Sequence, residues 1–421
     1  MTTTLRARTT AAASLAACVA LGVLAAAANG CFIQSTTREG AHASRTHHVP
    51  TGGSGGEGAI GGSGGGGAGG EAGQGGGGAS PCLPSSEHLA DFDIALPGLC
   101  LVAKYQAAMQ VGFSLSPTWG RHAGPITASY QPSPDDKVVL TRWMLPSGPT
   151  GELTAETQDV PVVIAAPAVY FGAQAVDLPF FGWTMVSWTG NYGSTDGEAI
   201  FVSNGAVVSR HAALGVFGAL GIAGPYTNRL VHTGLGALDD TASPALPALY
   251  ATDFCPDPPP CDHVTVASWG EANGPVCADQ DGNLFALATS FSTSQQTLRA
   301  FEASTIAPGA GQAAGNELFT IGGFGSQLAA LSPTLIDPGL AIYQPFDSGT
   351  YAALDVMAQP YTVAGTDIQP SGAPATALTM ATANTPVTLM TDAGGRLWVG
   401  IVGASQATTF YVLDRSEVVP L

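Results

Sequence analysis

Short apolar runs alternate with turn residues from Pro81 to the end of the chain. Most runs are about five to eight residues long, rich in Val, Ile, Thr, Phe, Tyr and Leu, and bounded by Gly, Pro, Asp, Asn or Ser. Sustained helical periodicity is hard to find, so the pattern predicts an all-β domain. Clear examples of predicted strands are Ile126–Tyr130, Lys137–Met144, Val160–Phe171 and Trp183–Trp188.

Two stretches read as four-stranded meanders around a tight turn. The first turns at Asp281-Gly282, and the second turns at Asp392–Gly395, near the C-terminus. The strands predicted for the first are Val264–Ser268, Pro275–Asp279, Asn283–Thr289 and Thr297–Glu302. The strands predicted for the second are Ala377–Ala381, Val387–Thr391, Arg396–Val402 and Thr408–Leu413.

Weaker copies of this unit centre on four other turns, at Asp136, Asp196-Gly197, Asp240 and Asp347–Gly349. Repeats of roughly 40–50 residues with four strands each are typical of a β-propeller. We therefore expect about six or seven four-stranded blades, and where two turns lie about 60 residues or more apart, either a blade carries an insertion or one further turn lies between them. A pair of tandem β-sandwiches is the alternative, because single strands look alike in both folds.

The second turn also carries a family resemblance. The segment Asp392–Gly400 (DAGGRLWVG) resembles the Asp…Gly-x-Leu-Trp-Val-Gly blade motif of bacterial extracellular β-propellers, and Asp281–Ala286 (DGNLFA) is a looser copy. The resemblance implies a fold and no activity. The related Ser-x-Asp-x-Gly-x-x-Trp box of sialidases differs in spacing from the segments at Ser194 and Asp392, so sialidase chemistry is not implied.

The first thirty residues have the pattern of a secretory signal peptide. Arg6 and Arg8 precede an apolar run from Ala11 to about Ala28, and small residues follow. A transmembrane anchor is the alternative, but the run reaches only the lower end of spanning length. We therefore predict a leader over residues 1–30 and an exported mature protein.

The end of the leader resembles a bacterial lipobox. Small residues precede Cys31 in the segment Ala28–Cys31, although Ala28 stands where the family usually has Leu. The resemblance implies diacylation of Cys31 with palmitate-type chains and attachment to a membrane. Phe32, rather than Asp, follows the cysteine, which by resemblance implies the outer membrane or cell surface. Ordinary cleavage that leaves Cys31 as a thiol is the alternative.

Residues 31–80 are predicted to form a disordered tether. From Thr51 to Ala79 the chain is almost wholly Gly, Ser, Ala and Glu, a composition that cannot bury apolar area. About thirty such residues have a root-mean-square reach of roughly 30 Å. The chain thus divides into a leader (1–30), a tether (31–80) and a β-propeller-like domain (81–421).

Composition and charge narrow the possible partners. The formal net charge is −18, and Lys104 and Lys137 are the only lysines among 421 residues. A strongly acidic, lysine-poor surface repels phosphate backbones, which excludes nucleic acid as an expected partner. We expect a monomer that contacts the membrane only through the lipid on Cys31.

The cysteines of an exported chain are expected to pair. Cys255 and Cys261 flank a short proline-rich loop and are predicted to form one disulfide, and Cys82 and Cys100 a second. Cys277 is then a buried thiol within a strand, although pairing of Cys100 with Cys277 remains an alternative.

No catalytic or metal-binding constellation is found in the sequence. Asp279–Asn283 alternates oxygen ligands like a calcium loop, but Ala288 stands where the bidentate Glu is required, so a hairpin turn is expected there. The five histidines of the domain are scattered singly, and its tryptophans are expected mainly in the sheet cores. No cofactor is predicted.

The sequence therefore predicts a non-enzymatic cell-surface lipoprotein that presents a β-propeller for protein or glycan binding. The alternative is an extracellular polysaccharide hydrolase or lyase, with its acids gathered from distant strands at the propeller mouth.

Overall fold

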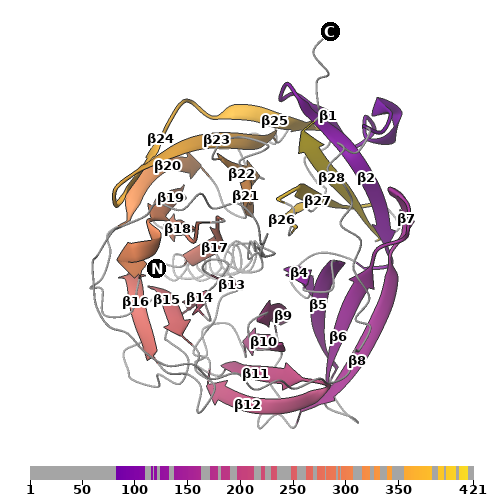
Figure 1. Ribbon diagram of the computed structural model, residues 1–421, viewed down its shortest axis with the longest axis vertical. Helices are drawn as coiled ribbons and strands as arrows, with labels where there is room; N and C mark the ends of the chain where they lie inside the picture. The colour runs from indigo at the N-terminus through magenta and orange to yellow at the C-terminus, as the bar shows by residue number, and fades with distance from the viewer. Residues whose placement is uncertain are drawn as a thin grey trace, which may run out of the picture.

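A computed structural model of the chain shows β-sheets arranged around a ring (Figure 1). This is the architecture of a β-propeller, so the predicted all-β propeller fold is confirmed and the sandwich alternative is wrong. The structure describes residues 82–109, 115–116, 118–120, 124–131, 137–162, 171–178, 182–189, 197–212, 220–222, 229–234, 248–253, 262–268, 273–279, 281–290, 293, 295–306, 315–322, 327–331, 339–343, 355–381, 387–392, 395–403 and 407–415.

The described strands form five hydrogen-bonded sheets. The nine-stranded sheet contains β3 (Leu115–Ser116), β4 (Thr118–Gly120), β5 (Gly124–Gln131), β6 (Lys137–Met144), β8 (Thr154–Pro161), β9 (Phe171–Leu178), β10 (Trp183–Thr189), β11 (Gly197–Ser203) and β12 (Ala206–Ala212). Two four-stranded sheets follow, with β13 (Leu220–Ile222), β14 (Arg229–Gly234), β15 (Ala248–Asp253) and β16 (Asp262–Ser268) in the first and β17 (Asn273–Ala278), β18 (Leu284–Ser290), β19 (Gln295–Phe301) and β20 (Asn316–Gly322) in the second.

The last two sheets both include strands from the start of the domain. The six-stranded sheet contains β1 (Phe92–Ile94), β21 (Gln327–Leu331), β22 (Gly339–Tyr343), β23 (Asp355–Ala364), β24 (Asp367–Pro370) and β25 (Ala375–Met380). The five-stranded sheet contains β2 (Leu99–Ala107), β7 (Thr150–Glu152), β26 (Val387–Thr391), β27 (Leu397–Val402) and β28 (Thr408–Arg415). The described helices are two short 3₁₀ turns, η1 (Ser85–Glu87) and η2 (Ala303–Ile306), and none of them has the length and apolarity of a membrane span.

The prediction of six or seven separate blades is wrong in number, because hydrogen bonds group the described strands into five sheets. The physical reason lies in the nine-stranded sheet, which contains two antiparallel runs, β4-β5-β6-β8 and β9-β10-β11-β12. The runs are joined where β5 pairs with β9 through Ala128 and Ala173. A sequence pattern that marks hairpins cannot show such a contact between two runs.

Both predicted meanders are displaced by one strand. Val264–Ser268 lies in β16, which closes the preceding sheet, and the sheet around Asp281-Gly282 instead continues to β20. In the same way Ala377–Ala381 overlaps β25, in the sheet before the Asp392 turn. Most of the strands were therefore located correctly along the chain, but their grouping into sheets was not.

The N-terminal strands close the ring. Strand β2 pairs antiparallel with β28 from Leu99↔Arg415 to Ala107↔Thr408, and β1 pairs with β25 of the neighbouring sheet. Figure 1 shows the indigo β2 lying beside the yellow β28. Two sheets built mainly from the end of the chain are thus completed by its beginning.

Side chains of the closing strands enter two core clusters. Leu101 of β2 packs in the same cluster as Phe92 of β1, Leu413 of β28 and residues of three sheets. Its neighbour Val102 packs in a second cluster with Trp398 and Phe410. Because successive side chains of a strand point to opposite faces, β2 contributes to the packing on both of its sides.

Several elements escaped the sequence pattern because they are polar or exposed. Strand β8 (TAETQDVP) is exposed along most of its length, and the hairpin formed by the end of β23 and β24 carries exposed Val363. The predicted strand Val160–Phe171 is wrong as a unit, since β8 ends at Pro161 and β9 begins at Phe171. An exposed strand lacks the apolar face on which the pattern depends.

Candidate functional site: the N-terminal clasp

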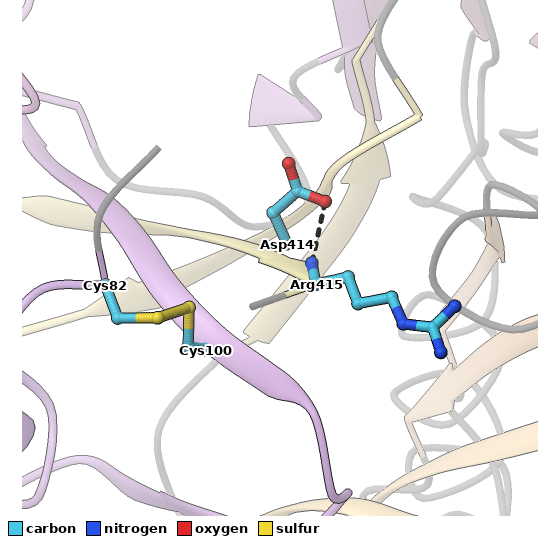
Figure 2. The surroundings of a disulfide bond; sticks show 4 residues. All are labelled: Cys82, Cys100, Asp414 and Arg415. Carbon is cyan, nitrogen blue, oxygen red and sulfur yellow. Dashed lines mark hydrogen bonds between the residues drawn. A yellow bond between two sulfur atoms is a disulfide. The ribbon is translucent and has the colours of Figure 1, made fainter. Parts of the chain in front are cut away.

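The described part of the domain begins with a segment that we call the N-terminal clasp, residues Cys82–Ala107, which contains η1, β1 and β2. Cys82 and Cys100 form a disulfide across it, with their Cα atoms 5.7 Å apart and a sequence separation of 18 (Figure 2). Cys100 lies at the start of β2 opposite Asp414, close to the end of β28. The disulfide therefore fixes the entry of the chain to the strand that closes the ring.

Polar contacts hold the clasp against the adjoining sheet. The Lys104 ammonium donates to the Glu87 carbonyl at 2.7 Å and to its carboxylate at 3.2 Å, and lies 5.5 Å from the centre of the Tyr411 ring. The Tyr411 hydroxyl donates to the Asp91 carboxylate. Burial first, and then the bond to Asp91 and its negative charge, raise the pKa of Tyr411 above its usual range. These contacts join the two ends of the described chain.

Aromatic packing completes the clasp. Phe92 is buried, stacks on the His88 ring at 5.1 Å and meets the Tyr411 ring edge-on at 4.9 Å. The His88 ring nitrogen Nδ1 lies 3.0 Å from the Phe92 carbonyl. His88 thus has a packing and hydrogen-bonding role in the clasp, and its ring is itself buried.

The Asp279–Asn283 turn, where the sequence suggested a comparison with calcium loops, is a hydrogen-bonded hairpin turn. Asp279 Oδ1 accepts from the backbone N–H groups of Asp281 and Asn283, both at 2.9 Å. Its Oδ2 accepts from Asn283 Nδ2 at 2.8 Å and from the Tyr361 hydroxyl at 2.7 Å. Tyr361 belongs to β23, so this carboxylate links two sheets. Desolvation by burial raises the pKa of Asp279 and outweighs the hydrogen bonds, which lower it.

The Asp392 turn repeats this geometry. Asp392 Oδ1 accepts from the Arg396 backbone N–H at 3.0 Å, while Oδ2 accepts from Arg396 Nε at 2.6 Å and from Trp398 Nε1 at 3.0 Å. The Trp398 ring is fully buried and stacks on Tyr105 of the clasp. The blade-type motif at Asp392 is therefore a structural turn whose carboxylate fixes a core tryptophan.

The other candidate residues are distributed over several elements. His211 is buried in β12, with Nε2 3.0 Å from the Ser209 hydroxyl, while His232 and His263 lie in β14 and β16. Trp143 and Trp398 are buried, in agreement with the prediction of core positions. In the described ranges, no three His, Cys, Asp or Glu side chains gather into a possible metal site. His122, Trp269, Asp135, Asp136, Asp239 and Asp240 lie outside the described residues.

The cysteine predictions have different outcomes. The Cys82–Cys100 disulfide is confirmed, so the alternative pairing of Cys100 with Cys277 is wrong. Cys277 is a fully buried thiol in β17, as expected. Cys31, Cys255 and Cys261 lie outside the described residues, and lipidation and the second disulfide remain predictions.

Sequence reasoning missed the polar contacts of the clasp. No sequence pattern marks Glu87, Asp91 or Tyr411, because the residues that they contact lie up to 320 positions away in sequence. One signal was present in Lys104, which is one of only two lysines in an acidic chain. A rare cation within an apolar run indicates a specific anionic partner nearby.

Comparisons with known proteins give only distant similarities. No known family profile matches the sequence, and no curated protein matches it. Among solved structures, the chain is similar to a protein of unknown function from Dyadobacter fermentans, with 12% identity, a TM-score of 0.44 and coverage of 76% of this chain and 100% of that one. It is also similar to the aldose sugar dehydrogenase of Escherichia coli, with 10% identity, a TM-score of 0.42 and coverage of 76% and 99%. A Trypanosoma rangeli sialidase has 11% identity, a TM-score of 0.42 and coverage of 75% and 60%. At this level of similarity neither activity is carried over to this chain.

Proposed function

We propose that this protein is a non-enzymatic cell-surface lipoprotein. In this proposal residues 1–30 are a signal peptide, a lipid on Cys31 holds the mature chain at the outer membrane or cell surface, and residues 31–80 are a disordered tether. The β-propeller, a monomer, presents a rigid surface to a protein or glycan partner. The observation that carries the proposal is the clasp, where a disulfide fixes the chain to the ring directly after the tether.

The two best-defined acidic turns support a binding role rather than catalysis. The carboxylates of Asp279 and Asp392 are buried and accept several hydrogen bonds each from their own turns and from core side chains. A general acid or nucleophile needs a carboxylate that can reach a substrate. Asp279 instead links two sheets, and Asp392 holds its own turn and a core tryptophan in place.

The lipid is tested by metabolic labelling with a palmitate analogue. The wild-type chain should be labelled and should fractionate with membranes, whereas Cys31→Ser should be unlabelled and should keep its leader, because diacylation precedes cleavage in this type of signal. Cys18→Ser is the matched control, because Cys18 lies in the predicted leader and its loss should leave labelling unchanged. Equal labelling of wild type and Cys31→Ser would contradict the proposal.

The binding role is tested with a chain that lacks residues 1–31 and therefore has neither leader nor lipid. Glycan arrays and capture of surface proteins should give saturable binding, and incubation with extracellular polysaccharides should leave their reducing-end content and their unsaturated uronate absorbance unchanged. Release of reducing ends or of unsaturated products would overturn the non-enzymatic proposal in favour of a hydrolase or a lyase.

A further inference from the structure

The disulfide of the clasp lies on the path by which tension in the tether would reach the propeller. The chain enters the described domain at Cys82, and the bond to Cys100 leads directly into β2. We propose that this disulfide is a mechanical bypass, which carries tether tension into β2 and leaves residues 83–99 unloaded. The inference rests on the tethered arrangement proposed above and adds a mechanical role to its junction.

With the disulfide closed, the load enters a well-supported strand. Strand β2 has nine residues and lies inside its sheet, paired on one side with β28 and on the other with β7 at residues 104–106. Leu101 and Tyr105 of this strand are buried. Tension on Cys100 is therefore resisted by hydrogen bonds to two neighbouring strands and by core packing.

With the disulfide open, the load would pass through much weaker structure. Between Cys82 and Cys100 the chain forms the three-residue turn η1 and the three-residue strand β1, which among the described strands lies at the edge of its sheet and pairs with β25 alone. Further restraints are the Leu83 N–H bond to the Leu101 carbonyl at 2.7 Å, the N–H bonds of Ala95 and Leu96 to the Ala377 carbonyl, the Ala381 N–H bond to the Asp91 carbonyl, and the side-chain contacts at Glu87 and Asp91. Short edge elements with few contacts are the first parts of a protein to open.

Opening of this segment would damage the domain itself. Phe92 is buried in the core cluster that includes Leu101 and Tyr411, and the Tyr411 hydroxyl would lose Asp91 as its acceptor. About 18 residues of released chain would also lengthen the tether by roughly 60 Å. The bypass keeps this length and this core cover in place while the protein is pulled.

The test is a force-ramp measurement on the full mature chain. One handle is attached at residue 31, and the other at an azide-bearing residue that replaces Val208, an exposed position on β12. The oxidised wild type should show smooth stretching of the tether but no discrete step before the propeller unfolds. Cys82→Ser/Cys100→Ser should show an earlier step of about 60 Å. Adding Tyr411→Phe should lower the force of that early step and should create no early step in the oxidised chain.

A second measurement does not require the serine variant to fold. Reductant added to the wild type under constant tension should produce the same early step, while the double-serine trace should not respond to reductant, which excludes effects at the remaining cysteines. An early step in the oxidised wild type, or none after reduction, would overturn the bypass. Because the handle replaces the lipid, this outcome is independent of the palmitate labelling that tests the proposed function.

Discussion

Three buried or partly buried carboxylates, those of Asp91, Asp279 and Asp392, accept hydrogen bonds from backbone N–H groups or aromatic side chains of the propeller. Burying a carboxylate costs several kcal/mol unless donors replace the lost water. Asp279 and Asp392 accept from backbone N–H groups and from one aromatic side chain each, Tyr361 and Trp398. At the scale of single residues, these three carboxylates stabilise the fold.

The hydrogen bond between Tyr411 and Asp91 can be tested by removing the Tyr411 hydroxyl. Tyr411→Phe keeps the ring packed on Phe92 and below Lys104 but removes the donor to the Asp91 carboxylate. Hydrogen bonds to charged groups contribute about 1.5–3 kcal/mol, so the free energy of unfolding should fall by that amount in urea titrations. Tyr105→Phe, on the partner strand β2, is the matched control, since it removes no bond to Asp91. Equal losses in both variants would contradict the assigned role.

Two tyrosines should resist ionisation in alkali. Burial and the nearby carboxylates of Asp279 and Asp91 raise the pKa values of Tyr361 and Tyr411 above their usual range. Because each pKa is higher in the folded than in the unfolded chain, their contribution to stability is complete below about pH 10 and is lost as the pH rises further. Absorbance at the phenolate wavelength should therefore show a fraction of the ten tyrosines, which includes Tyr361 and Tyr411, ionising only as the protein unfolds. Tyr361→Phe should reduce this late fraction by one tyrosine, and full ionisation of a folded chain would contradict the assigned burial.

At the scale of elements, the two strongest sequence motifs, at Asp279–Asn283 and Asp392–Arg396, form turns of the same type. In both, an Asp carbonyl accepts from a glycine N–H and its own N–H donates four residues ahead, and Gly282 and Gly395 have φ angles of 86° and 80°. A residue with a side chain is strained in this region, which explains the glycine of the motif. The weaker copies at Asp136 and Asp240 instead fall between β5 and β6 and between β14 and β15. They mark a different connection, which explains the uneven spacing of the predicted repeats.

The role of the Asp392 turn predicts a large effect of a small change. Asp392→Asn replaces one of the two carboxylate oxygens by an NH2 group, so either the Trp398 indole N–H or the Arg396 backbone N–H loses its acceptor. A buried donor left unsatisfied costs about 1–3 kcal/mol, and the lost ion pair with Arg396 adds to this. Urea denaturation should show a loss of about 2–4 kcal/mol. In a double-mutant cycle, Trp398→Phe should make part of this loss non-additive, and strict additivity would show that the indole bond is unimportant.

The sequence located strands better than it grouped them. Lys137–Met144 coincides with β6, an apolar run in which Val138, Val139 and Leu140 are all buried, and the turn at Asp281-Gly282 is predicted from its residues alone. The residues of β16 do not show whether it is the last strand of one sheet or the first strand of the next. Its place depends on which neighbouring strand it forms hydrogen bonds with, and in the structure that strand is β15. The clasp was hidden for the same reason, because Asp91 and Tyr411 are 320 positions apart.

At the scale of the whole molecule, the order of strands explains how the ring is closed. Strand β2 completes a sheet whose other main strands, β26, β27 and β28, come last in the chain. Closure therefore requires contacts across nearly the full length of the domain, which slow folding because chain entropy is lost before those contacts form. Unfolding from either end must also break the pairing of β2 with β28, and the disulfide fixes the start of β2 there.

This closure predicts opposite results for two truncations. Removal of residues 1–80 takes away only the predicted leader and tether, so the thermal midpoint should stay within about 2 °C of the mature chain. Removal of residues 1–107 also deletes the clasp, and with it Leu101 and Tyr105 from two core clusters and the partner of β28. The exposed edge and lost apolar contacts exceed the few kcal/mol by which domains are stable. Near-ultraviolet circular dichroism should show a cooperative transition for the first protein and none for the second. A cooperative melt after removal of residues 1–107 would show that the ring does not depend on its N-terminal strands.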